Sequence, residues 1–210
     1  HYPLRRQRQM CIRDSGKTTL VSHLAVEAER VGNVTWIIDT DQQATLSLWH
    51  DRRKLESPER AEIPFHRLEA GLKALAKRGV EYCMIDTAPT VSDQNSVLFK
   101  LADLVLIPVR PSPADLWSVA ETVKQVKASS KPFLFVISQA KSRASITAQS
   151  VAALSQYGRV AQSFIADRVV YAAAMTSGET ASELEPKGAA AKEIAALWTE
   201  IKSYFHEKLN

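Results

Sequence analysis

Short apolar runs alternate along the chain with longer segments in which apolar residues recur every three or four positions. Four runs have the length and β-branched content of buried strands: residues 34–39, 81–86, 103–109 and 132–138. Weaker strands are predicted near residues 63–68 and 160–165. The three- and four-residue spacing predicts helices over residues 17–30, 43–55, 69–77, 93–101, 114–127, 147–157 and 187–207.

This alternation is typical of βαβ units and predicts an α/β fold, with a mostly parallel sheet covered by helices on both faces. We expect residues 15–210 to form a single domain, because no internal repeat or linker interrupts them. In such folds ligands bind at the carboxyl ends of the strands. Polar residues at those ends are therefore the candidates for chemistry.

Residues 1–14 do not fit this pattern. A strand should lead into the first helix, but this segment has no run of apolar β-formers. We interpret it as a foreign segment that replaces the true first strand, through a cloning scar, a frameshift or a sequencing artefact. The alternative is a divergent native arm, whose Arg5–Arg8 run would then be a candidate for contacting DNA.

Charge and cysteine content favour a cytoplasmic protein without a strong electrostatic bias. The net charge is +4, of which residues 1–14 contribute +3, so the remaining body is close to neutral and does not by itself indicate nucleic-acid binding. Cys11 and Cys83 fit no metal spacing and are expected to be free thiols in a reducing compartment. No apolar run approaches the roughly 20 residues of a membrane span, and no secretory signal is visible.

The clearest chemical signature is Gly16-Lys17-Thr18-Thr19, at the start of the first predicted helix. Gly16 lets backbone N–H groups approach a phosphate, Lys17 supplies charge to the β- and γ-phosphate oxygens, and Thr18 offers a hydroxyl to Mg²⁺. The helix N-terminus adds its dipole. This is the second half of a phosphate-binding loop, or P-loop.

Carboxylates follow two of the predicted buried strands. Asp86 ends one strand, where an acid commonly holds Mg²⁺ or its waters beside a nucleotide. Asp39 and Asp41 follow another strand, and one of them could position the attacking water while the other orients the metal's hydration shell. The bland alternative is that each acid only caps a strand end or a turn.

These motifs occur in the order found in a known family, and the chain resembles a ParA-type partition ATPase of the ParA/MinD branch of P-loop proteins. The resemblance covers about residues 15–205. Its matching pieces are the GKTT helix, IIDTDQQATLSLW (37–49), YCMIDTAPT (82–90), ADLVLIPVRPSPADLWSV (102–119) and the tail DRVVYAAAMTSGETASELEPKGAAAKEIAALWTEI (167–201).

The resemblance implies a switch protein that binds and hydrolyses ATP with Mg²⁺. It implies that Gly16, Lys17, Thr18 and Thr19 bind the nucleotide, with Lys17 also serving catalysis.

By the same resemblance, Asp41 matches the catalytic carboxylate assigned to the hydrolytic water. Thr18, Asp39 and Asp86 match the metal-side groups. ATP-bound molecules are expected to form a homodimer that binds DNA without sequence preference. A ParB-like partner would stimulate hydrolysis during plasmid or chromosome partition, and the protein would be cytoplasmic and nucleoid-associated, with no membrane partner.

The chain departs from the family pattern at several positions. Ile12 stands where the family's signature lysine reaches the other subunit's nucleotide, which puts cross-dimer chemistry in doubt if the segment is native. Ser138 stands where many relatives have the asparagine that contacts the base, so adenine specificity is less secure than phosphate binding. Arg168 is similar in placement to a DNA-contacting residue of relatives, and a surface ion pair is the alternative.

Other functions stay open on the same scaffold. One is a related cargo-positioning or DNA-transfer ATPase, MinD-like or VirC-like. A second is a metabolic P-loop ligase similar to dethiobiotin synthetases, and a third is a catalytically impaired nucleotide-binding module. Three tryptophans are expected in the core or an interface, and three histidines in the core or in solvent; these are Trp49, Trp117, Trp198, His23, His50 and His66.

Overall fold

The structure, a computed structural model, describes residues 16–88, 93–141 and 145–209. The described chain falls into two compact units. One, here called the α1 unit, comprises Thr18–Ala88 and Arg168–Thr199, and the remaining described residues form the α5 unit. The prediction of a single domain stays a prediction, and each unit is described by itself.

The α1 unit is built on a parallel sheet. Strand β1 (Thr35–Asp39) lies between β2 (Glu59–Arg60) and β3 (Tyr82–Asp86). Ile37 and Ile38 are neighbours on β1, so their side chains point to opposite faces of the sheet. Both are buried, at 0% and 1% exposure. Both faces of this sheet are therefore covered, which explains why the centre of β1, residues 36–38, is continuously apolar rather than alternating.

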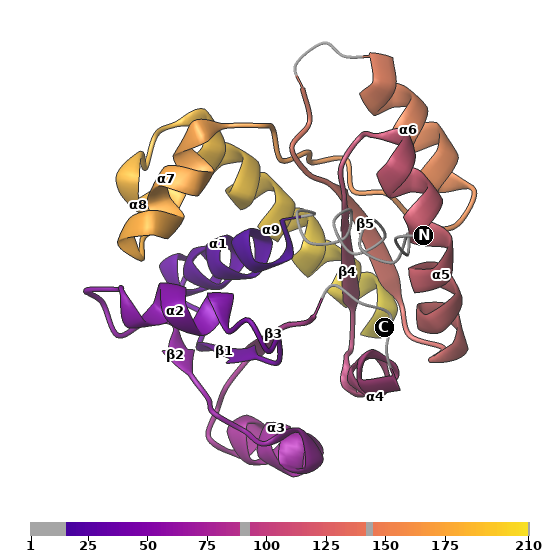
Figure 1. Ribbon diagram of the computed structural model, residues 1–210. Helices are drawn as coiled ribbons and strands as arrows, with labels where there is room; N and C mark the ends of the chain where they lie inside the picture. The colour runs from indigo at the N-terminus through magenta and orange to yellow at the C-terminus, as the bar shows by residue number, and fades with distance from the viewer. Residues whose placement is uncertain (1–15, 89–92, 142–144, 210) are drawn as a thin grey trace, which may run out of the picture. The chain divides into compact units, whose positions relative to one another are not determined.

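Helices supply that cover. They are α1 (Lys17–Arg30, of which Lys17 itself belongs to the α5 unit), α2 (Thr45–Asp51), α3 (Leu68–Lys77), α7 (Val169–Ser177), α8 (Ala181–Leu184) and the first half of α9 (Ala189–Leu209). Val26 of α1 and Leu46 and Trp49 of α2 pack with Ile37 in one apolar cluster. The ribbon places α7 and α8 beside α1 (Figure 1).

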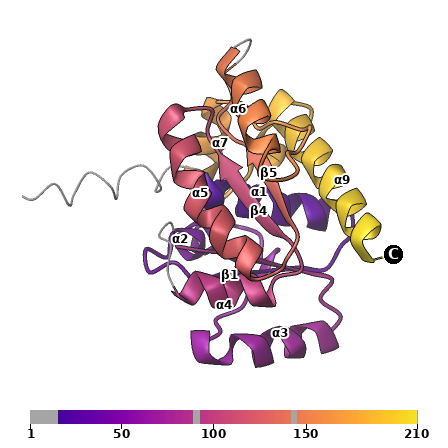
Figure 2. The same cartoon turned by 90° about the vertical axis from the view of Figure 1, so that its right-hand side faces the viewer.

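The α5 unit repeats this logic on a smaller sheet. Strands β4 (Val105–Val109) and β5 (Phe133–Ile137) pair in parallel. Helices α4 (Asp93–Leu101), α5 (Pro113–Ala128) and α6 (Ser145–Ser155) accompany them, and α5 is seen lying along β4 (Figure 2). Ser112 caps α5 by accepting from the Asp115 N–H, and Pro113 opens the helix. The two sheets and their helices confirm the predicted α/β class with parallel strands.

Three local predictions were wrong. The strand expected near residues 63–68 is a 3₁₀ turn, η2 (Phe65–Arg67), and the short strand beside β1 is Glu59–Arg60 instead. The helix predicted over residues 43–55 is confined to α2, because Ala44 before it has φ 51° and cannot continue a helix. In place of the strand predicted near residues 160–165, the structure has isolated bridges at Val160 and Ala166. Helices α7 and α8 were not predicted.

Helix α9 carries an apolar stripe. Ile194, Leu197, Trp198 and Ile201 are at most 2% exposed, so the stripe is core. In the described part of the chain, no helix combines the length and apolarity needed to span a bilayer.

Candidate functional site

The central feature of the site is a hydrogen bond between its two best sequence motifs. Thr18 lies in the first turn of α1, and its hydroxyl donates to Oδ2 of Asp86 at 2.6 Å, across 68 positions of sequence. The Asp86 side chain is 1% exposed. A buried carboxylate needs such donors, because an unpaired one is costly. The folded chain thus brings together Thr18 and Asp86, both predicted as metal-side residues.

The end of β3 is fixed from both sides. Oδ1 of Asp86 accepts from the Thr87 N–H at 3.1 Å. The Asp86 carbonyl accepts from both the N–H and the hydroxyl of Thr40, at 3.0 and 2.6 Å. Asp39 and Asp86 are register partners on the paired strands β1 and β3. Two of the predicted acids therefore lie at neighbouring strand ends, as the parallel topology demanded.

Asp39 also has a structural task. Its Oδ1 accepts from the Asp41 N–H at 3.0 Å, and its Oδ2 accepts from the Ser47 N–H at 2.9 Å. Ser47 lies in the first turn of α2, whose N-cap residue, Ala44, has no side-chain oxygen. Asp39 therefore caps α2 from a distance, a role that the sequence did not predict. Its metal-side role stays a prediction.

Asp41 lies on the loop between β1 and α2. Its Oδ1 accepts from the Gln43 N–H at 3.0 Å, which closes a tight turn. The residue is partly exposed. A half-exposed carboxylate two residues beyond a strand end can reach a water molecule, which is the property that its predicted catalytic role needs.

The α5 unit contains the other part of the GKTT motif. Gly16 has φ +82°, a conformation that favours glycine. A Cβ added to Gly16 would lie 4.0 Å from Cβ of Ser138, which directly follows β5. Gly16 and Ser138 are therefore close neighbours. Lys17 begins α1, while Ile12 and the rest of residues 1–14 lie outside the described residues.

The donor set fits magnesium better than a transition metal. Thr18 and Asp86 offer hard oxygen atoms, the ligands that Mg²⁺ prefers. Among the described residues, no group of three or more His, Cys, Asp or Glu side chains could hold a metal ion. Mg²⁺ typically takes only one or two protein ligands and completes its shell with water and phosphate oxygens. The residues present are compatible with that mode.

Several further residues test the sequence interpretation. Trp49, Trp198 and His23 are buried, at 2%, 2% and 1% exposure, as expected for core positions. Trp117 on α5 is 80% exposed, so it does not belong to the core. Arg168 donates to Oε1 of Glu193 through Nε and Nη2, at 2.9 and 2.6 Å, which is the surface ion pair considered as an alternative.

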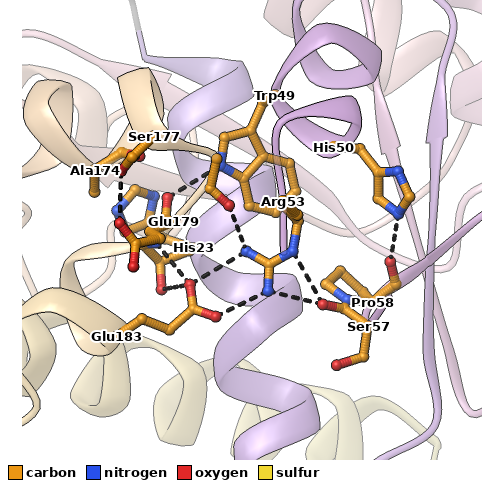
Figure 3. Close-up of polar contacts among 12 residues, drawn as sticks. His23, Trp49, His50, Arg53, Ser57, Pro58, Ala174, Ser177, Glu179 and Glu183 are labelled. Atoms are coloured by element: carbon orange, nitrogen blue, oxygen red, sulfur yellow. Dashed lines mark hydrogen bonds and ion pairs between the residues drawn. The ribbon is translucent and has the colours of Figure 1, made fainter. Parts of the chain in front are cut away.

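Sequence reasoning missed a buried polar network that connects α1, α2 and α8. It contains the ion pair Arg53–Glu183 and the ring of His23 (Figure 3). One signal was available: Thr180 and Glu183 form a T-x-x-E capping box at the start of α8. The Arg53 contact had no local signal, because its partner lies 130 residues away.

The chain resembles known proteins in sequence and in fold. No known protein-family model matches the chain. The chain is similar to maintenance of carboxysome distribution protein A from Halothiobacillus neapolitanus, with 26% identity over 196 residues, covering 89% of this chain and 90% of that protein.

Two solved structures share the fold. One is an ATP complex of a Cyanothece McdA variant, with TM-score 0.74 and 19% identity, covering 91% of this chain and 92% of that one. The other is the septum site-determining protein MinD with Mg-ADP from Pyrococcus horikoshii, with TM-score 0.73 and 15% identity, covering 90% and 91%. In sequence and fold, this chain is thus similar to ATPases of the ParA/MinD type.

Proposed function

We propose that this chain is a switch protein that binds and hydrolyses ATP and positions a cargo inside a bacterial cell. The observation that carries the proposal is the 2.6 Å hydrogen bond from Thr18 to Asp86, which joins the start of the phosphate-binding helix to a buried acid at a strand end. The similarity to proteins whose structures contain ATP or Mg-ADP supports the choice of nucleotide.

Each residue of the proposed nucleotide site has a role that follows from its charge and position. Gly16 leaves room for phosphate near the backbone N–H groups, Lys17 neutralises charge on the β- and γ-phosphates, and Thr19 continues the binding turn. Thr18 and Asp86, with Asp39 nearby, would hold Mg²⁺ and its waters. When bound, Mg²⁺ supplies positive charge to the phosphate oxygens. Phosphoryl transfer needs little more than this positioning and neutralisation.

Asp41 is the proposed catalytic carboxylate. Its partly exposed side chain would orient the attacking water and accept its proton. Slow hydrolysis is expected from the protein alone, since an added positive charge from a second subunit or a partner can raise such rates greatly.

The proposed switch acts as an ATP-dependent homodimer that responds to a ParB-like partner protein. The name of the similar Halothiobacillus protein refers to carboxysome distribution, which favours a cargo-positioning role over plasmid or chromosome partition. Nonspecific DNA in the cytoplasm would be the surface that the ATP-bound dimer binds while it positions the cargo. Because Arg168 is held by Glu193, a DNA contact through Arg168 would require that pair to open.

The proposal is tested by substituting Lys17 with alanine and measuring Mg-ATP binding by calorimetry. Binding should be lost in Lys17→Ala and kept in Lys77→Ala, a control lysine in the last turn of α3. Equal ATP affinity in wild type and Lys17→Ala would refute the nucleotide site.

A second experiment separates the alternatives. Co-sedimentation with random DNA and with liposomes, each with and without ATP, distinguishes a DNA-based switch from a MinD-like one. A metabolic ligase predicts turnover that DNA leaves unchanged. A binding module predicts that ATP binds without hydrolysis, and that hydrolysis returns when an apolar first strand replaces residues 1–14.

A further inference from the structure

His23 lies at the centre of a buried hydrogen-bond network in the α1 unit (Figure 3). The residue is 1% exposed. Its Nδ1 lies 2.8 Å from the carbonyl oxygen of Thr19, and its Nε2 lies 3.0 Å from the backbone nitrogen of Ala181. An N–H can only donate, so Nε2 is the acceptor and the proton resides on Nδ1. His23 therefore donates to Thr19 and accepts from Ala181.

The surroundings keep this ring neutral. The edge of Tyr171 packs against it at 5.1 Å between ring centroids, and Ser22 Oγ lies 3.3 Å from Nδ1. Burial lowers the pKa of His23 to about 4, although the Thr19 carbonyl and the negative charge of Glu183 act in the opposite direction. Near neutral pH the ring is uncharged, with one nitrogen for each of its two backbone partners.

The Thr19 end of this contact belongs to the proposed phosphate-binding turn. Thr19 follows Thr18, whose hydroxyl is bonded to Asp86. The Thr19 carbonyl oxygen accepts hydrogen bonds from Nδ1 of His23 and, at 3.0 Å, from the Ser22 hydroxyl. The first turn of a helix has N–H groups without intrahelical partners, and it frays most readily. Additional donors on a carbonyl of this turn fix its orientation.

The Ala181 end belongs to α8, which is itself held firmly. Glu183 accepts from the Thr180 N–H at 2.7 Å and, through both carboxylate oxygens, from Arg53 at 2.8 and 3.2 Å. The Arg53 side chain is only 2% exposed. It also donates to the Gly178 carbonyl at 2.9 Å and lies 4.7 Å above the ring of Trp49. The start of α8 is thus locked onto Arg53, which follows α2 and packs on Trp49 of that helix.

We propose that His23 is a positioning residue for nucleotide binding, which holds the Thr18–Thr19 turn in place by tying it to the locked start of α8. This inference rests on the proposed function, because it assigns the turn to the phosphates. It predicts that ATP affinity depends on Arg53, just after α2, and on residues at the start of α8, none of which contacts the nucleotide. Hydrogen bonds run from Arg53 through Glu183 to Thr180, and from the next residue, Ala181, through His23 to Thr19.

The test compares ATP affinities at a temperature where circular dichroism reports complete folding of every variant. His23→Leu removes both hydrogen bonds of the ring. It should weaken Mg-ATP binding by about tenfold, which corresponds to the net free energy of about one buried hydrogen bond. His23→Asn retains a donor that can reach Thr19 and should weaken binding by no more than about threefold. The control is Leu75→Ala, a buried position on α3 that destabilises the same unit without touching the network.

A double-mutant cycle tests the proposed route. Glu183→Gln should weaken Mg-ATP binding by about threefold when His23 is present, and should add nothing in the His23→Leu background. Wild-type affinity in His23→Leu would overturn the proposal. Equal losses in His23→Leu and Leu75→Ala would also overturn it, because they would reflect stability alone.

Hydrogen exchange without nucleotide keeps this inference separate from the proposed function. The peptide covering residues 18–26 should exchange about tenfold faster in His23→Leu than in wild type or Leu75→Ala. If wild type binds no nucleotide, the proposed function fails, and this exchange difference still decides whether His23 holds the turn. Unchanged exchange would overturn the positioning role.

Discussion

Thr18 and Asp86 are joined by a hydrogen bond of 2.6 Å, although one lies in the first turn of a helix and the other ends a strand 68 residues later. Both partners of this hydrogen bond, a hydroxyl and a buried carboxylate, are side chains of the protein. It serves the fold as well as the proposed metal site, so substitutions should affect both.

Thr18→Ala should lower the free energy of unfolding by about 1–3 kcal/mol, because the Asp86 carboxylate loses a donor while staying buried. Thr18→Ser keeps the hydroxyl and is the matched control. Urea denaturation without nucleotide measures the effect on stability. A titration of Mg²⁺ at fixed ATP measures the effect on the metal site, and Thr18→Ala should need about tenfold more Mg²⁺ than Thr18→Ser to bind ATP. Identical Mg²⁺ curves for the two variants would exclude Thr18 from the metal site.

Asp41→Ala should leave ATP binding intact and reduce steady-state turnover by about 100-fold, the usual contribution of a general base. Asp41→Asn is the informative companion, because its amide oxygen can still accept from the Gln43 N–H and keep the turn closed. Phosphate release and ATP binding are measured in parallel. Normal turnover in Asp41→Asn together with loss in Asp41→Ala would assign the residue to loop structure rather than to catalysis.

Gly178→Ala should destabilise the protein by more than about 2 kcal/mol. Gly178 has φ +74°, and an added Cβ would lie 2.5 Å from the Arg52 carbonyl carbon and 2.6 Å from the Arg53 nitrogen. Gly79 has φ +87° and open space around it, so Gly79→Ala should cost only about 1 kcal/mol of backbone strain. Thermal or urea unfolding measures the difference. Similar losses in the two variants would contradict the close approach of the two backbone segments.

His23 should make stability depend on pH. Its folded-state pKa, about 4, is below the ordinary value of 6.5, so the unfolded chain binds more protons between these values. The contribution of His23 to the free energy of unfolding is fully present above about pH 6.5. It is lost progressively as the pH falls toward 4, by up to about 3 kcal/mol. The urea midpoints of wild type and His23→Phe should therefore converge as the pH falls from 7 to about 4.5. A constant gap over that range would contradict the neutral, buried ring.

The sequence was sufficient for features that repeat or that follow chain order. The strands of 34–39 and 81–86 were predictable because a strand buried on both faces is apolar throughout. The meeting of Asp39 and Asp86 followed from the rule that parallel strands end at the same edge. The GKTT motif gave the start of α1, since glycine precedes the helix with positive φ.

Other features depended on tertiary contacts. Helices α7 and α8 are short and rich in alanine and small polar residues, with no amphipathic period to reveal them. Trp117 was predicted to lie in the core or an interface, and its exposure excludes the core; the helical pattern does not say which neighbour covers an apolar side chain. The bond from Ser47 to Asp39 was not predicted, because it compensates for the missing side-chain cap at Ala44.

The two structural roles of Glu183 restrict the order in which Glu183 and Arg53 can be lost during evolution. A single carboxylate completes the capping box of α8 and neutralises the enclosed guanidinium of Arg53. Loss of the acid would leave an enclosed cation and an uncapped helix together, while loss of the arginine would leave the acid still useful as a cap. Natural relatives should therefore lose the arginine first and the glutamate only afterwards, so that sequences with Arg53 but without Glu183 are rare.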